Sequence, residues 1–98
     1  MKIKKINIPP SREDHFWQAH QVTKDDVIHV FDSGQKNVFL RVPDKQPESD
    51  GTLLKVLGRG ENGRYLAVIF RLYEDFHAYV ITARDMDDAE RRLYGRRK

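Results

Sequence analysis

The sequence predicts an α+β domain in which helices pack on one face of a mostly antiparallel sheet. Three observations lead to this prediction. Residues 64–73 and 76–82 are β-rich, largely apolar runs that flank a two-residue acidic turn, as in a hairpin. Two helix-start signals lie near the N-terminus. The chain ends in a run with acidic residues first and basic residues last, which suits the macrodipole of a helix.

The first quarter of the chain is expected to form an edge strand and a short helix. Residues 1–8 alternate apolar and polar side chains, and the two prolines that follow end the strand. Ser11 is the expected N-cap of a helix that runs to about residue 20. Phe16 and Trp17 are its expected buried anchors.

A second helix is expected to follow at once. Thr23 is its predicted N-cap, and Asp26 stands three residues later, where a capping box requires an acceptor. Gly34 is a candidate left-handed terminator of this helix. Its expected apolar face is formed by Val27, Val30 and Phe31.

The remainder is expected to supply four strands and a terminal helix. Strands are predicted at 37–42, 52–59, 64–73 and 76–82, with a polar loop at 43–51 and a tight turn at 60–63. Asp87 and Glu90 have the spacing of a capping box at the start of the last helix. The predicted order is β-α-α-β-β-β-β-α, with the first strand joining the later sheet.

Length and composition restrict the classes of protein to which the chain can belong. Its 98 residues predict a single domain with one modest core. The absence of cysteine excludes disulfides, thiolate metal sites and a cysteine nucleophile. His15 and His20 lie five residues apart, so they do not share a helix face, and no metal or other cofactor is expected. No leader or membrane span is predicted, and a cytoplasmic location is expected.

The basic residues are concentrated in the second half. The formal net charge is +3, and eight of the ten basic residues after position 50 are arginines. Arginine suits forked contacts with phosphate or carboxylate groups. This distribution is typical of a solvated helix end, of an RNA-binding surface or of a surface for an acidic protein.

Several short motifs resemble the BrnT family, ribonuclease toxins of bacterial type II toxin–antitoxin systems that have a RelE-like fold. Leu57-Gly58-Arg59 and the run from Gly63 to Phe70 are similar to a hairpin of that family. Val80-Ile81-Thr82-Ala83-Arg84 is followed, after five residues, by Glu90-Arg91-Arg92-Leu93-Tyr94, which matches a further family pattern in its spacing. The resemblance covers about residues 14–95. The chain differs from the family in its first strand and first helix.

The resemblance implies a metal-independent endoribonuclease in which the 2′-hydroxyl of the RNA is the nucleophile. Such an enzyme needs a proton acceptor, a cation facing the phosphorane-like charge and a proton donor. The resemblance also implies inhibition of translation and neutralisation by a cognate antitoxin, a BrnA-like ribbon-helix-helix protein. The partners are then the RNA substrate, the antitoxin and, through the complex, operator DNA, with no membrane.

Seven residues are candidates for the site. Arg84 is the first choice as the cation that faces the phosphate; a structural clamp to a nearby aspartate is the alternative. His77 can transfer protons near neutral pH, although its strand parity differs from that of Arg84. Glu90 is better explained as a cap than as a base. The candidate catalytic residues are Arg84, Arg59, Tyr94 and His77, and the candidate RNA contacts are Arg91, Lys55 and Arg71.

A second hypothesis belongs to a different class of protein. The altered first strand and first helix also fit a non-catalytic module of the same fold that binds RNA or a protein. Such a module would retain RNA in a salt-dependent way without producing fragments.

Overall fold

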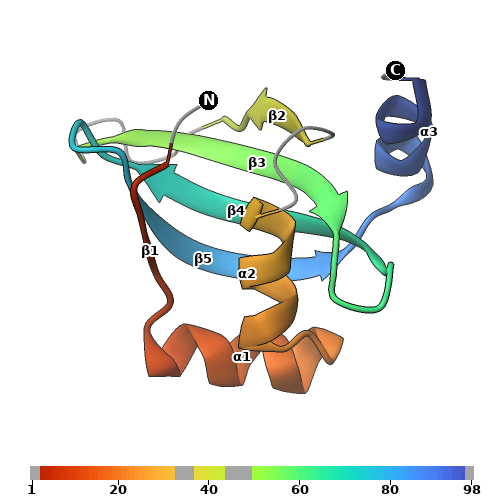
Figure 1. The fold of residues 1–98 in the computed structure, drawn as a ribbon, viewed down its shortest axis with the longest axis horizontal. Coiled ribbons are helices and arrows are strands. Elements are labelled where there is room, and N and C mark those ends of the chain that lie inside the picture. The colour runs from red at the N-terminus through yellow and green to blue at the C-terminus, as the bar shows by residue number, and fades with distance from the viewer. Residues whose placement is uncertain (1–2, 33–36, 44–49, 97–98) are drawn as a thin grey trace.

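The computed structural model describes residues 3–32, 37–43 and 50–96, and it confirms the α+β class and the predicted element order. The predicted terminator Gly34 and most of the predicted polar loop lie outside these residues. No helix within these ranges is long and apolar enough to cross a membrane. The elements are β1 (Lys5–Asn7), α1 (Pro10–His20), α2 (Lys24–Asp32), β2 (Val38–Arg41), β3 (Thr52–Arg59), β4 (Tyr65–Leu72), β5 (His77–Asp85) and α3 (Asp88–Arg96), as Figure 1 shows.

The five strands form one open sheet in the order β1-β5-β4-β3-β2. The strands β2 to β5 pair antiparallel with their neighbours in the chain. β1 pairs in parallel with β5, from Lys5 opposite His77 to Asn7 opposite Tyr79. The first and last strands of the sequence are therefore neighbours, and β1 is the predicted edge strand that joins the later sheet.

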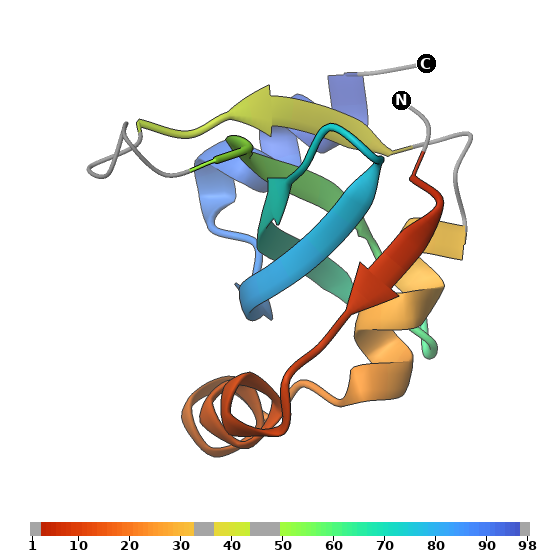
Figure 2. The ribbon, with the colours of Figure 1, turned by 90° about the vertical axis from the view of Figure 1, so that its left-hand side faces the viewer.

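Helices lie on both faces of the sheet, so the prediction that they share one face was wrong. α1 and α2 cover one face, where Phe16, Val27 and Val30 pack in the main core against side chains of β3, β4 and β5. α3 lies on the other face, where Tyr94 packs with Leu57 in a smaller cluster. Figures 1 and 2 show the sheet between these two layers. The central strands carry apolar side chains on both faces, and both faces therefore need cover.

The starts of the three helices agree with the predictions in two cases. At α2, the N–H of Asp26 donates to Thr23 Oγ1, and the N–H of Thr23 donates to the Asp26 carboxylate. The predicted capping box at α3 is present as well. At α1 the predicted cap Ser11 is wrong, because Pro10 takes the first helical position and Pro9 precedes it as N-cap.

The two predicted anchors of α1 have different environments. Phe16 is fully buried, whereas the side chain of Trp17 is 49% exposed. Only one of them faces the sheet, because consecutive residues of a helix point in different directions. Trp17 was therefore wrongly predicted as an anchor.

A β-bulge in β5 changes which side chains share a face. Ile69 of β4 is opposite Thr82, while its neighbour Phe70 is opposite Val80, so Ile81 is the extra residue. Residues before and after a bulge exchange parity. The bulge therefore places His77 and Arg84 on the same face, although their spacing alone assigns them to opposite faces. β5 continues to Asp85, three residues beyond the predicted end at 82.

Arg64 connects the first helix to the sheet. Its guanidinium donates to the backbone carbonyls of His20 and Gln21 at 2.7 and 2.6 Å. It also donates to both carboxylate oxygens of Asp85. These contacts satisfy carbonyls at the C-terminal end of α1, where a cation is favoured by the helix dipole.

Candidate functional site

Five of the seven predicted site residues gather at one end of the sheet, on the face that carries α3. Arg84 lies beside Ala67, which in turn lies beside Leu57, so one row crosses β5, β4 and β3. Lys55 alternates with the core residues Leu54 and Val56 and therefore shares this face. The five residues are Lys55, Arg59, Arg84, Arg91 and Tyr94.

Glu90 of α3 is held by two of these predicted cations. The Arg84 guanidinium donates from Nη1 to Oε1 at 2.7 Å and from Nη2 to Oε2 at 2.9 Å, which is a forked, bidentate pair. Lys55 Nζ lies 2.6 Å from Oε2. The Glu90 side chain is 6% exposed, against 30% for Arg84 and 22% for Lys55. The Glu90 carboxylate thus lies between α3 and these two cations and is less exposed than either of them.

The same carboxylate also caps α3. The backbone N–H of Asp87 donates to Glu90 Oε1, and the N–H of Glu90 donates to Asp87 Oδ1. Burial opposes ionisation of Glu90, but the hydrogen bonds from Arg84, Lys55 and the Asp87 backbone outweigh it and lower its pKa to about 2. The hydrogen bond to Glu90 also raises the pKa of Arg84. Glu90 is therefore ionised at neutral pH and is a poor proton acceptor.

Two further arginines lie over the ring of Tyr65. The Cζ atoms of Arg59 and Arg91 are 4.2 and 4.5 Å from the ring centroid, within the range of cation–π contacts. Within the described ranges, neither guanidinium forms an ion pair with a carboxylate. Both arginines are thus held in place by an aromatic ring while their charge is not neutralised by an acid.

Tyr94 belongs to the packing between α3 and the sheet. Its side chain is 9% exposed and packs with Leu57, Ala67 and Met86. Its ring meets that of Tyr65 edge-on, with 5.9 Å between the centroids. The structure therefore gives Tyr94 a packing role, which was the alternative to base stacking.

The other two predicted residues, His77 and Arg71, lie away from this cluster. His77 lies opposite Tyr73, whereas Arg84 lies opposite Ala67. Tyr73 and Ala67 are six residues apart, which corresponds to about 20 Å along the strand. Arg71 lies on the same strand as Ala67, four residues or about 13 Å away, and it is only 9% exposed. The bulge gives His77 the same face as Arg84 but does not bring the two together.

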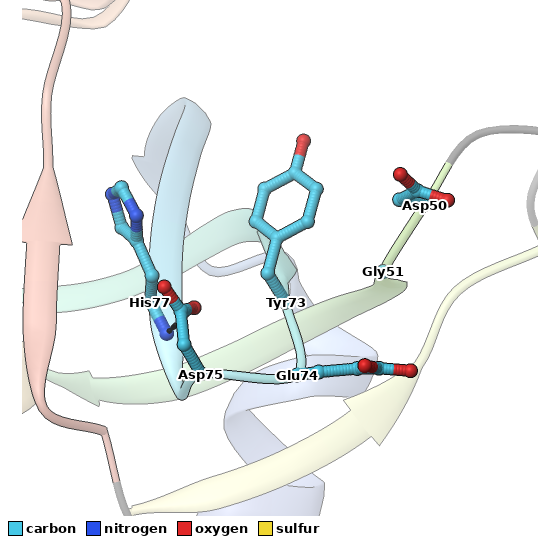
Figure 3. Close-up of a pocket in the computed structure, with 6 residues that line it drawn as sticks. All are labelled: Asp50, Gly51, Tyr73, Glu74, Asp75 and His77. Atoms are coloured by element: carbon cyan, nitrogen blue, oxygen red, sulfur yellow. Dashed lines mark hydrogen bonds between the residues drawn. The ribbon is translucent and has the colours of Figure 1, made fainter.

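His77 lines an acidic pocket of about 550 Å³ at the β4–β5 hairpin, shown in Figure 3. Asp50, Glu74 and Asp75 contribute carboxylates to it, and the Tyr73 ring stands beside the His77 ring. Nε2 of His77 is buried without a hydrogen-bond partner among the residues described. Three carboxylates close together make this pocket unfavourable for a phosphate group.

The hairpin loop beside this pocket differs from the prediction. The predicted two-residue turn of Glu74 and Asp75 is a three-residue loop, because Phe76 adopts a left-handed conformation with φ 63° before the strand resumes. A phenylalanine gives no sequence signal for that conformation.

Over the described ranges, no group of three or more histidine, aspartate or glutamate side chains is arranged to hold a metal ion. The side chains of the α3 end offer guanidinium, ammonium and phenol groups. These groups can bind and orient a phosphodiester and stabilise negative charge that develops on it.

Sequence reasoning missed the role of Tyr65. The predicted turn at 60–63 would place Arg59 opposite Arg64, whereas the structure pairs Arg59 with Tyr65 across the hairpin. Cross-strand pairs of this kind place a cation against a ring. The contacts of Arg64 with the end of α1 and with Asp85 were also not predicted from the sequence.

No protein-family model matches the sequence, and a search of curated proteins gives no significant match.

Proposed function

We propose that this chain is a metal-independent endoribonuclease of the BrnT-like toxin class, and that RNA binds across the α3 end of the sheet. The observation that carries this proposal is the stack of Arg59 and Arg91 on Tyr65, next to Arg84 and Lys55. Single-stranded RNA is typically held by cations that follow its backbone and by aromatic or guanidinium planes on which its bases stack. The cluster offers both kinds of group within one surface.

The proposed reaction uses few protein groups. The 2′-hydroxyl of the RNA gives its proton to water as it attacks the adjacent phosphate, and the 5′ oxygen of the next nucleotide leaves with a proton taken from water, which yields a 2′,3′-cyclic phosphate and a 5′-hydroxyl. Arg84 faces the phosphorane-like charge, while Arg59 and Arg91 position the flanking phosphates. His77 is too far from Arg84 to serve the same phosphate, and Glu90 is too weak a base.

The toxin class also implies partners and a cellular effect. Cleavage of RNA would inhibit translation and growth. A cognate antitoxin of the ribbon-helix-helix type would neutralise the toxin by covering the basic surface, and the complex would bind operator DNA. Support for these partners comes from the motif resemblance, and the uncompensated charges of Arg59 and Arg91 fit an acidic antitoxin segment.

The test is RNA cleavage in excess EDTA, followed on a denaturing gel. We expect wild type to cut and Arg84→Ala to lose about 10²- to 10³-fold in rate, which is typical for removal of a group that stabilises transition-state charge. Arg12→Ala, an exposed arginine of α1, is the matched control and should cut like wild type. Circular dichroism must show that both variants are folded. Cleavage by Arg84→Ala at the wild-type rate would remove Arg84 from the mechanism.

One observation favours a second function, a non-catalytic RNA-binding module. Glu90 forms ion pairs with two cations of the proposed site, and it has a pKa of about 2. A module of this kind retains RNA without cutting it, either free or on ribosomes. Retention that weakens steeply with salt, with no fragments in either setting, would establish this function and reject the nuclease.

A further inference from the structure

We propose that Glu90 occupies, from within the chain, a phosphate-binding site formed by Arg84 and Lys55, so that α3 blocks the site until an RNA phosphate displaces the carboxylate. This inference rests on the proposed function, because it concerns the same end of the sheet. It adds a regulation that the proposed function does not contain: the folded chain is held in a closed form by its own helix.

The geometry of the ion pairs supports this inference. A phosphodiester shares one negative charge between its two nonbridging oxygens, and a carboxylate shares one negative charge between its two oxygens. The forked contact of Arg84 with both oxygens of Glu90 is the contact that a guanidinium makes with a phosphate. Lys55 adds a second cation to Oε2 at 2.6 Å. The two cations exceed the single charge of Glu90, so the site retains an attraction for a further anion.

The packing of α3 supports the displacement. The helix has nine residues, and helices of this length are marginal in water without tertiary contacts. Its buried residues are Glu90 and Tyr94. A helix held by so few buried groups belongs to the part of a domain that opens most easily. An anion that displaces Glu90 from Arg84 and Lys55 therefore removes one of the two buried contacts that hold α3 on the sheet.

The test compares Glu90→Gln with wild type in binding to a fluorescent, 2′-O-methylated single-stranded RNA, which cannot be cleaved through its 2′ position. The glutamine amide oxygen can still accept the N–H of Asp87 and preserve the cap. Asp14→Asn, an exposed residue of α1, makes the same charge change on the other face and serves as the matched control. Circular dichroism and thermal melting check that all variants are folded.

We expect Glu90→Gln to bind the RNA about tenfold more tightly, the size of one charge-assisted contact. The slope of log affinity against log salt should steepen by about 0.7, because one more phosphate of a single strand is neutralised. Asp14→Asn should stay close to wild type. The double variant Glu90→Gln/Arg84→Gln should lose the gain. Equal or weaker binding by a folded Glu90→Gln would overturn the inference and leave Glu90 as a structural clamp.

A separate readout keeps this inference distinct from the proposed function. Inorganic phosphate is titrated into labelled protein, and the Arg84 Nε–H resonance is followed by NMR. We expect Glu90→Gln to show a saturable shift at phosphate concentrations where wild type shows none. If no variant binds RNA but this shift occurs, the RNA function fails and the anion site stands. If RNA binds and the shift is absent, the blocked site is rejected.

Discussion

Glu90 connects two parts of the molecule through a single side chain. It caps α3 through the backbone of Asp87 and accepts hydrogen bonds from Arg84 and Lys55. A buried carboxylate requires such donors, because an unpaired charge in this position would be strongly destabilising. The stability of α3 is therefore coupled to the ionisation of this group.

The lowered pKa of Glu90 predicts a stability that depends on pH. The carboxylate titrates near 4.5 when unpaired and at about 2 in the folded chain, so its contribution is complete above about pH 5 and is lost as the pH falls towards 2. We expect a loss of about 1 to 3 kcal/mol over this interval, measured by urea unfolding. Glu90→Gln should show a shallower decrease, and an unchanged pH slope would contradict this assignment.

Arg59 and Arg64 offer a matched pair of substitutions in one motif. Arg64→Ala removes the bonds to the end of α1 and to Asp85, and we expect it to lower the free energy of unfolding by about 1 to 2 kcal/mol without changing RNA affinity. Arg59→Ala should lower RNA affinity with a smaller loss of stability. Urea unfolding and fluorescence anisotropy distinguish the two results. The reverse pattern would assign RNA binding to Arg64.

At the scale of elements, sequence patterns predicted where the strands begin and end better than they predicted which face of the sheet each helix covers. β3 has its predicted bounds, because apolar residues and a glycine-containing turn mark both ends. The cap of α1 was mispredicted because Pro10 outweighs Ser11 at the helix start. The side chosen by α3 depends on where Tyr94 finds apolar partners, and this requires knowledge of the assembled sheet.

The β5 bulge could not be predicted from the sequence. In a regular strand, His77 and Arg84 would point to opposite faces because they are seven residues apart. The extra residue Ile81 places them on the same face. No sequence signal marks Ile81 as a bulge. The motif containing Arg84 nevertheless led to Arg91 and Tyr94, and a second motif led to Arg59. The pairing of Glu90 with Arg84 and Lys55 was not predicted, and Tyr65 was missed.

Two glycines test the packing of the helices on the sheet. A Cβ at Gly58 would lie 2.5 Å from Asn37 Oδ1 and 2.9 Å from Val30 Cγ1, so Gly58→Ala should destabilise the fold by about 1 to 3 kcal/mol. A Cβ at Gly95 of α3 meets nothing within 4 Å, so Gly95→Ala should stabilise by about 0.5 to 1 kcal/mol. Thermal melting measures both, and a stable Gly58→Ala would contradict the described contact.

At the scale of the whole molecule, the Arg59–Arg91 pair and the acidic pocket lie at opposite ends of the sheet. The α3 end carries Arg59 and Arg91 without acidic partners within the described ranges, whereas the β4–β5 hairpin carries a pocket with three carboxylates. If RNA is the substrate, as proposed, we expect attraction at the first end and repulsion at the second. The proposed substrate path therefore stops short of His77.

This polarity predicts the footprint of RNA on the protein. Uncleavable RNA should shift amide NMR signals of α3 and of the neighbouring ends of β3, β4 and β5, and leave those of the 73–77 hairpin unchanged. His77→Ala should then cleave RNA at the wild-type rate, although histidine chemistry made this residue a candidate. Shifts centred on the hairpin, or an inactive folded His77→Ala, would move the site to the acidic end.

The pairing of β1 with β5 also has a consequence for the order of events in folding. Lys5 meets His77, so this edge closes only after almost the whole sheet has been synthesised and arranged. Contacts that span so much chain are formed slowly, since a large loop must close before they are made. The hairpins β2–β3–β4–β5 join neighbouring segments and are able to assemble earlier. The β1 segment of a chain still emerging from the ribosome therefore stays unpaired until β5 has been made.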